Sequence, residues 1–388
     1  MKKHSWTTAL LFLTVLFSFS VAFWILPDRS FSEQEMRSLR TLPRVTVKKL
    51  TSGELSGEIN DYFADQFPAR DLLVGWKGLC EIALGRQEND GILLGKNGAL
   101  ARYRFDLLHT DGSITEDTDG LDYGAISAAV EGINRANRSL SVPFTVLLTG
   151  RNLDVDPKSF AYPADGSDAL LNAVAQRLEP IVQTVETVPL FRRLSEEGEQ
   201  VYYKTDHHWT TLGAYHAYVE VMRSFGMGGE ILPVSHFERR TVTDRFYGSL
   251  WSAAGMKWVK PDQLELWLAG DEDSFHVTAD GKPLDGLYSM RWIEKKDCYS
   301  VFLDGVHDEI TVMREGDRPT LLLIKDSFAN SLAPFLARHF NLVLLNLSST
   351  RADCTDIAAC AEKYGADRVL LVYTLENLIT SDRLSRLH

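Results

Sequence analysis

The sequence predicts an α/β fold in which helices cover both faces of a parallel sheet, preceded by a helix long enough to cross a membrane. Three continuous apolar runs near the end of the chain indicate the sheet, and a helical pattern follows each: 320–324, 341–346 and 368–373. Strands of a parallel sheet are apolar along their whole length because both of their faces are buried. An uncharged apolar run from Trp6 to Leu26 indicates the membrane helix.

The N-terminal apolar run has positive charge before it and ends at Pro27. Because Lys2 and Lys3 precede the run, the N-terminus is expected in the cytoplasm and the rest of the chain outside. A cleaved signal peptide, which would give a secreted protein, is the alternative, since Ser20-Val21-Ala22 has the pattern of a cleavage site. The apolar residues continue past that site to Leu26, which favours an uncleaved anchor and a single-pass membrane protein.

The composition excludes some functions. The formal net charge of the 388 residues is -12, so the basic surface that nucleic-acid binding requires is missing. The four cysteines, Cys80, Cys298, Cys354 and Cys360, include no C-x-x-C pair, which argues against a thiolate zinc site. On a straight helix Cys354 and Cys360 are too far apart for a disulfide, so all four are expected to be thiols.

The chain is expected to have three regions. Residues 1–27 form a cytoplasmic tip and transmembrane anchor, residues 28–100 form a helical stalk, and residues 101–388 form the α/β domain. Within this domain, residues 227–318 interrupt the alternation of helices and strands with turns and aromatic residues. This segment is predicted to be a mostly β insertion.

The stalk carries a helical pattern that breaks at Pro68 and ends at Gly85. Its large apolar residues recur at roughly helical spacing. They are Phe63, Phe67, Leu72, Leu73, Trp76 and Leu79. We expect this stripe to be core that packs the stalk onto the main domain.

Ser327 occupies the turn between the predicted strand 320–324 and a helix that begins at Phe328. Active sites of open parallel sheets lie at the carboxyl ends of the strands. The backbone N–H groups and dipole of the following helix are suited to stabilise an oxyanion there. The alternative is that Ser327 or Asp326 only caps the helix. The motif G-x-S-x-G is absent, so this turn is not an α/β-hydrolase elbow.

A serine hydroxyl needs a base, and the base needs a carboxylate that holds its tautomer. Asp206 and His208 supply both, and in an extended segment residues two apart point to the same side. One alternative is a pair of surface histidines near a helix cap. The other is a metal site that adds His207 and His216 to these residues, but no H-E-x-x-H pattern supports it. We therefore expect no metal and no cofactor.

These residues lie in Tyr203-Lys-Thr-Asp-His-His-Trp209, which resembles the signature of the bacterial DHHW family. Segments 37–43, 62–100, 246–250 and 325–330 also resemble that family. The DHHW family is similar to the alginate O-acetyltransferase group, whose catalytic domain is a rearranged SGNH hydrolase-like fold. The resemblance therefore implies an SGNH hydrolase-like three-layer sandwich with a parallel sheet.

The resemblance also implies roles for individual residues. Ser327 matches the nucleophile, His208 the general base and Asp206 the acid that orients it. By their position in the strand order, Arg351 and Tyr373 match an arginine and a tyrosine that line the site in the related acetyltransferases. No glycine matches the usual oxyanion hole, and Asn330 or Asn377 are the candidates to replace it.

The function implied is serine-dependent acyl transfer outside the cytoplasm, through an acyl-serine intermediate. The expected substrate is a cell-surface polysaccharide that becomes O-acetylated, and the expected partner is a multi-pass membrane acyltransferase that provides the acetyl group. Two alternatives stay open: an acetyl esterase that acts on the same polymer, and a non-catalytic envelope protein that binds glycan.

Overall fold

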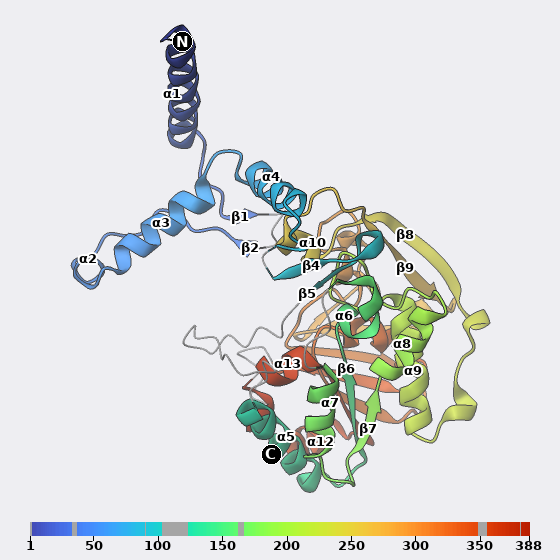
Figure 1. Ribbon diagram of the computed structural model, residues 1–388. Coiled ribbons are helices and arrows are strands. Elements are labelled where there is room, and N and C mark those ends of the chain that lie inside the picture. Colours follow the sequence, from blue (N-terminus) through green and yellow to red (C-terminus); the bar gives the residue numbers. More distant parts are fainter. Residues whose placement is uncertain are drawn as a thin grey trace. The chain divides into compact units, whose positions relative to one another are not determined.

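The computed structural model separates into two compact units (Figure 1). The smaller unit consists of Met1–Asn89 and Ser252–Trp258, and the larger of Asp90–Trp251 and Val259–His388. The structure describes residues 2–32, 37–89, 91–102, 123–161, 167–347, 355–380 and 382–388.

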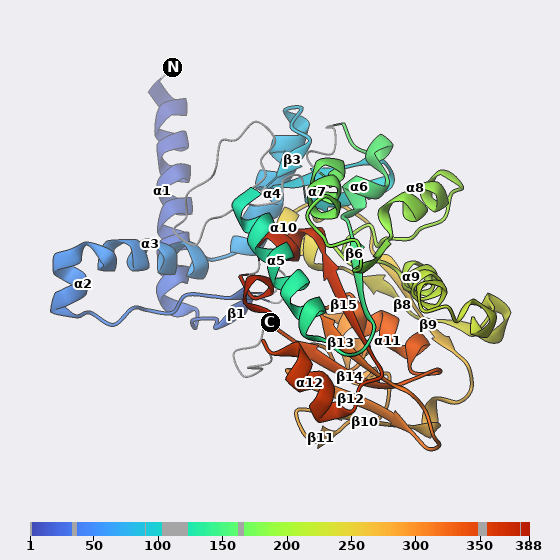
Figure 2. The same cartoon turned by 90° about the horizontal axis from the view of Figure 1, so that it is seen from below.

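Eight strands among the described residues form the central sheet of the larger unit (Figures 1 and 2). Their order is β11-β10-β12-β14-β13-β15-β6-β7. Strands β14, β13, β15, β6 and β7 run parallel, whereas β10, β11 and β12 extend one edge in antiparallel fashion. The bounds are β6 Phe144–Thr149, β7 Gln183–Glu186, β10 Phe275–Ala279, β11 Lys282–Pro283, β12 Glu309–Arg314, β13 Thr320–Lys325, β14 Asn341–Asn346 and β15 Arg368–Thr374.

Helices cover both faces of this sheet, because alternate apolar residues of each strand point to opposite sides. On β13, Leu321 and Leu323 pack with α8, α9 and α11, whereas Leu322 and Ile324 pack with α5, α7, α12 and α13. The predicted three-layer α/β fold is therefore confirmed. The helix bounds are α5 Tyr123–Ser139, α7 Ser167–Ala175, α8 Val188–Glu196, α9 Thr211–Ser224, α11 Ala329–Leu336, α12 Ile357–Tyr364 and α13 Leu375–Thr380.

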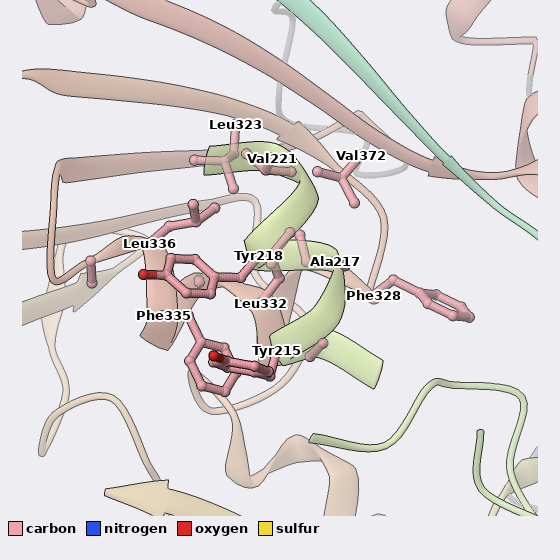
Figure 3. Packing of buried hydrophobic residues seen from close by; sticks show 14 of the residues in the cluster. Tyr215, Ala217, Tyr218, Val221, Leu323, Phe328, Leu332, Phe335, Leu336 and Val372 are labelled. Carbon is pink, nitrogen blue, oxygen red and sulfur yellow. The ribbon is translucent and has the colours of Figure 1, made fainter. Parts of the chain in front are cut away.

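The core on the α9 side is rich in aromatic rings (Figure 3). Tyr218 of α9 stacks on Phe335 of α11, with ring centroids 5.6 Å apart. Figure 3 shows these two helices packed against Leu323 and Val372 of the central strands. Each large apolar side chain buried in this way contributes on the order of 1.5–3 kcal/mol, so this layer holds the two helices firmly on the sheet.

Residues 227–318 contain five strands, and three of these strands belong to the main sheet. These residues form a hairpin of β8 (Glu238–Phe246) and β9 (Asp262–Leu268), and they also supply β10, β11 and β12 of the central sheet. The remaining short elements are α6 Asn152–Val155, α10 Ser249–Ala254, β3 Glu88–Asn89 and a hairpin of β4 Ile92–Leu94 with β5 Leu100–Arg102.

The smaller unit begins with α1 (Lys2–Ile25), and its segment Trp6–Ile25 is the one helix in the described part of the chain that is long and apolar enough to cross a membrane. The strands β1 (Phe31–Ser32) and β2 (Arg37–Ser38) follow. Three helices come next: α2 Val47–Ser52, α3 Glu54–Gln66 and α4 Arg70–Ala83. The predicted break at Pro68 is confirmed, because Pro68 lies between α3 and α4, and the predicted end at Gly85 is confirmed, because α4 ends at Ala83.

The apolar stripe of α3 and α4 is not core, so the expectation about it is wrong. Leu72 is 63% exposed and Trp76 is 58% exposed. Helix α4 packs instead through its small residues: a Cβ added at Gly75 would lie 3.0 Å from the side chain of Lys257, and one added at Gly78 would lie 3.4 Å from the backbone of Gly255. The large apolar side chains of α4 consequently point away from its own unit.

The expectation that all four cysteines are thiols is also wrong. Cys360 is disulfide-bonded, whereas Cys80 and Cys298 are free. The expectation assumed a straight helix through residues 354–360, but α12 begins only at Ile357, and Cys354 lies outside the described residues.

Candidate active site

The loop that carries Asp206 and His208 is narrow and bent. Tyr202 and Trp209 form a β-bridge at its base, and the N–H of Tyr203 donates to the carbonyl of His208. The N–H of His208 donates to Asp206 Oδ1 at 3.0 Å, which closes an Asx-type turn. The expectation of an extended backbone is therefore wrong. Asp206 and His208 are in contact because the Asp206 side chain closes a turn with the N–H of His208.

Ser327, His208 and Asp206 form a continuous hydrogen-bonded chain. His208 Nδ1 lies 2.6 Å from Asp206 Oδ1, and His208 Nε2 lies 2.7 Å from Ser327 Oγ. With the Nδ1 proton donated to the carboxylate, Nε2 is left to accept the hydroxyl proton of the serine. Ser327 reaches this position because it follows β13, at the carboxyl edge of the parallel strands. The arrangement is that of an activated serine nucleophile.

Asp206 is buried, and three donors surround its carboxylate. Oδ1 accepts from the N–H and Nδ1 of His208, and Oδ2 accepts from the N–H of Ser249 at 2.7 Å. Burial by itself raises the pKa of Asp206, but the charges of His207 and His208 and these hydrogen bonds outweigh it and hold that pKa below its ordinary value. Because its pKa is lowered, Asp206 is in its ionised carboxylate form when it orients His208.

Gly248 lies directly against Asp206. A Cβ added at Gly248 would overlap the Cβ and carboxylate of Asp206. The N–H of Gly248 donates to Thr205 Oγ1 at 3.2 Å, so the Phe246–Leu250 segment is attached to the catalytic loop from this side. In the sequence this segment is only part of a family resemblance, and the requirement for glycine becomes visible only from the close approach.

Tyr299 supports the ring of His208, and it is not among the residues predicted from the sequence. The two rings stack with centroids 3.7 Å apart and planes at 9°. The hydroxyls of Tyr299 and Ser331 are hydrogen-bonded at 2.9 Å, and the indole N–H of Trp209 donates to the same Ser331 oxygen at 2.8 Å. A single tyrosine outside any motif carries no signal in one sequence, so only the structure identifies it.

His207 lies beside His208 and not on the opposite side, as an extended backbone would require. The two ring centroids are 3.9 Å apart, and His207 Nδ1 is 2.6 Å from Ser249 Oγ. Burial and the neighbouring His208 lower the pKa of His207. Possible ligand atoms of Asp206, His207 and His208 lie within 4.8 Å of one another, but His216 is not part of this group. Because Asp206 and His208 already hold one another and Ser327, their contacts favour a triad.

The proposed oxyanion residues lie in different places. Asn377 lines the cleft beside the site, and its Nδ2 donates to Asp326 Oδ2 at 2.9 Å. Asn330 is buried; its Oδ1 accepts from Lys325 at 2.6 Å and its Nδ2 donates to the carbonyl of Gly305 at 2.9 Å. Asn330 thus has both ends of its amide engaged elsewhere, and only Asn377 borders the cleft.

The remaining two candidates are not part of the described cleft. The ring of Tyr373 is buried in the core shared with α5 and α7. Arg351 lies outside the residues that the structure describes.

A cleft borders the triad. Its wall includes Phe328, which follows Ser327, and His207 with Ser249, which adjoin His208 and Asp206. Arg102 and Glu376 form an ion pair of 3.2 Å across another part of the wall. The other lining residues are Ala101, Gly150, Arg151, Asn152, Leu250, Thr374 and Asn377. A wall with this many hydrogen-bonding groups suits a polar, hydroxyl-bearing ligand.

The larger unit is thus an α/β domain with a serine at the carboxyl edge of its parallel strands. The family pattern described as DHHW protein matches residues 183–346 of this chain. The matched range includes Asp206, His208 and Ser327, so the resemblance recognised in the sequence is confirmed.

The chain is similar to solved structures of other proteins. A DHHW family protein from Eubacterium siraeum DSM 15702 is 17% identical, with 76% of this chain and 97% of that chain covered and a TM-score of 0.57. Bacillus cereus PatB1, solved with a sulfonyl adduct, is 19% identical, with 76% and 100% covered and a TM-score of 0.60. The O-acetyltransferase domain of Pseudomonas putida AlgJ is 13% identical, with 77% and 95% covered and a TM-score of 0.47. No curated protein matches the sequence.

Proposed function

We propose that Ser327, His208 and Asp206 are a catalytic triad that transfers acetyl groups to hydroxyls of a cell-surface polysaccharide. The observation that carries this proposal is the unbroken chain from Ser327 Oγ through the imidazole to the carboxylate, with contacts of 2.7 and 2.6 Å. A serine, a histidine and an aspartate at these distances convert a weak alcohol into a nucleophile.

The reaction proceeds in two halves. Ser327 Oγ attacks the carbonyl carbon of a donor acetyl ester, and His208 takes the hydroxyl proton; the donor oxygen then leaves with that proton, and acetyl-serine remains. In the second half a hydroxyl of the acceptor attacks acetyl-serine, and His208 accepts its proton and returns it to Ser327 Oγ. Asp206 stabilises the imidazolium that forms in each half.

Three features support this choice of substrate and place. The cleft is lined by polar groups that suit a hydroxyl-rich polymer, and α1 supports a membrane-anchored chain whose cleft lies outside the cytoplasm. The resemblance to alginate O-acetyltransferases supports acetyl as the group, with a multi-pass membrane acyltransferase as its supplier. The sulfonyl adduct of PatB1, a protein with the same fold, supports a reactive nucleophile, because sulfonyl reagents modify activated serines.

The first test uses the full chain in detergent with p-nitrophenyl acetate and a sulfonyl fluoride. Ser327→Ala should lose activity by a factor on the order of 10³ or more and should no longer gain the mass of the sulfonyl group. His208→Ala should match it, because members of a triad act as a unit, while His207→Ala should lose less.

Ser127→Ala, at an exposed serine on α5, is the matched control and should keep the wild-type activity. Full activity of Ser327→Ala would exclude the serine mechanism.

A second assay separates the alternatives. Acetyl groups that reach a polysaccharide acceptor identify a transferase, whereas release to water only identifies an acetyl esterase. If Ser327→Ala still binds glycan and the wild type neither transfers nor hydrolyses, the protein is a non-catalytic binding protein.

A further inference from the structure

Helix α4 has its large and small residues on unexpected sides. Its exposed side carries Leu72, Trp76 and Leu79, which are 63%, 58% and 44% exposed. Its inner side packs through Gly75 and Gly78. An ordinary surface helix buries its large apolar residues and exposes polar ones, so the exposed face of α4 is suited to an apolar environment outside its own unit.

Contacts with α1 fix the position, measured along the axis of α1, of the chain that leads into α4. Phe67, which precedes α4, stacks on Phe19 of α1 with ring centroids 5.3 Å apart. Phe63 of α3 stacks on Phe23 at 5.0 Å. Phe67, three residues before the start of α4, therefore lies beside the last two turns of the apolar helix.

The ends of the membrane span are marked by tryptophans. Trp6 and Trp24 are separated by a helical rise of about 27 Å, close to the thickness of a bilayer core of about 30 Å. Tryptophan prefers the boundary between the lipid headgroups and the acyl chains. Phe19 lies about 9 Å inside the end of α1 at Ile25, so the ring of Phe67 is at or just below this boundary.

The segment between the span and α3 has the charge expected beside anionic lipids. Residues 27–52 contain six arginines and lysines but three aspartates and glutamates, although the whole chain carries a net charge of -12. A basic segment next to an apolar helix face is typical of a surface that binds anionic membranes.

We propose that the exposed face of α4, formed by Leu72, Leu73, Trp76, Leu79 and Cys80, lies in the headgroup–acyl boundary of an anionic bilayer. The proposal rests on the retention of α1 as an anchor in the proposed function. Apolar faces of interfacial helices insert about 5–10 Å, which agrees with the level of Phe67. The lipid surface is thus a second binding partner of this chain, and it holds the stalk against the membrane.

Cys80 provides a native reporter, because it is exposed and free and lies on this face, whereas Cys298 is buried. The full chain is reconstituted into nanodiscs of phosphatidylethanolamine and phosphatidylglycerol and labelled with a polarity-sensitive thiol dye. Cys80→Ser shows how much of the label is on Cys80. Lipids spin-labelled near the top of the acyl chain should quench more than half of the Cys80 emission, and aqueous iodide should quench little of it.

Two variants sharpen the test. Trp76→Gln with Leu79→Gln should move the Cys80 dye into iodide-accessible water while α1 keeps the chain resistant to alkaline extraction. A dye on Glu196→Cys in the Cys80→Ser background, at an exposed residue of the larger unit, should be open to iodide throughout.

Each other outcome overturns the proposal in a distinguishable way. An iodide-accessible Cys80 dye in an extraction-resistant wild-type chain would leave the anchor intact but refute insertion of α4. Shielding from iodide without quenching by spin-labelled lipid would mean that protein covers this face, either the larger unit or a second copy. If the chain is cut after Ala22, the anchor fails, and a processed chain that no longer sediments with anionic vesicles would refute the α4 proposal as well.

Discussion

Gly248 shows how one residue without a side chain decides the position of the Asp206 carboxylate. Gly248→Ala should displace Asp206, because the added methyl would overlap it. A displacement of about 1 Å from the reactive geometry costs roughly 100-fold in rate, and overpacking costs about 1–3 kcal/mol in the free energy of unfolding. We expect losses of that size in kcat for p-nitrophenyl acetate, measured together with urea unfolding.

Gly229→Ala is the matched control, since nothing lies within 4 Å of a Cβ added there. Its kcat and stability should stay at the wild-type level. A Gly248→Ala protein with the wild-type kcat would show that the close approach does not constrain Asp206.

At the scale of elements, strand β9 holds the loop that carries Asp206 and His208. The contact is made by Asp262, the first residue of the strand. Asp262 is buried, and its carboxylate accepts from the N–H of Lys204 at 3.0 Å and from the N–H and hydroxyl of Thr205 at 2.8 and 2.7 Å. The hairpin of β8 and β9 thereby fixes the positions of Lys204 and Thr205, which directly precede Asp206.

Asp262→Ala should leave these buried donors without an acceptor, at a cost of about 1–3 kcal/mol for each group. It should lower the free energy of unfolding and the acetyl-esterase rate together, while Asp262→Asn, which keeps one acceptor oxygen, should fall between. Asp168→Ala is the control, because its exposed ion pair with Arg192 is worth no more than about 1 kcal/mol. Equal stabilities of Asp262→Ala and Asp168→Ala would contradict this role.

At the scale of the whole molecule, the proposed function requires the cleft to lie outside the cytoplasm, and the charge before α1 is the basis for that topology. Lys2 and Lys3 favour a cytoplasmic N-terminus, so a reporter that is active only in the cytoplasm should stay silent when fused after His388. A periplasm-active or exterior-active reporter at the same position should give a strong signal. The reverse pair of signals would place the triad in the cytoplasm and exclude a surface polysaccharide as substrate.

The sequence by itself determined the elements that depend on local pattern. The apolar runs that became β13, β14 and β15, the span of α1 and the break at Pro68 could be predicted, because strand burial, helix length and proline geometry act over a few neighbouring residues. The sequence also predicts that Asp206, His208 and Ser327 form one site, since a serine nucleophile requires these partners.

The tertiary structure alone decided the contacts between distant segments that no sequence motif marks. Tyr299 behind His208, Asp262 beneath the loop and Gly248 against Asp206 come from residues that carry no motif, and their roles exist only through contacts made on folding. The same holds for β10–β12 at the edge of the parallel sheet and for the exposed stripe of α4. Helical spacing shows that one face of a helix is apolar. Whether that face is buried in the protein core or left exposed depends on which face of the helix packs against the rest of the unit.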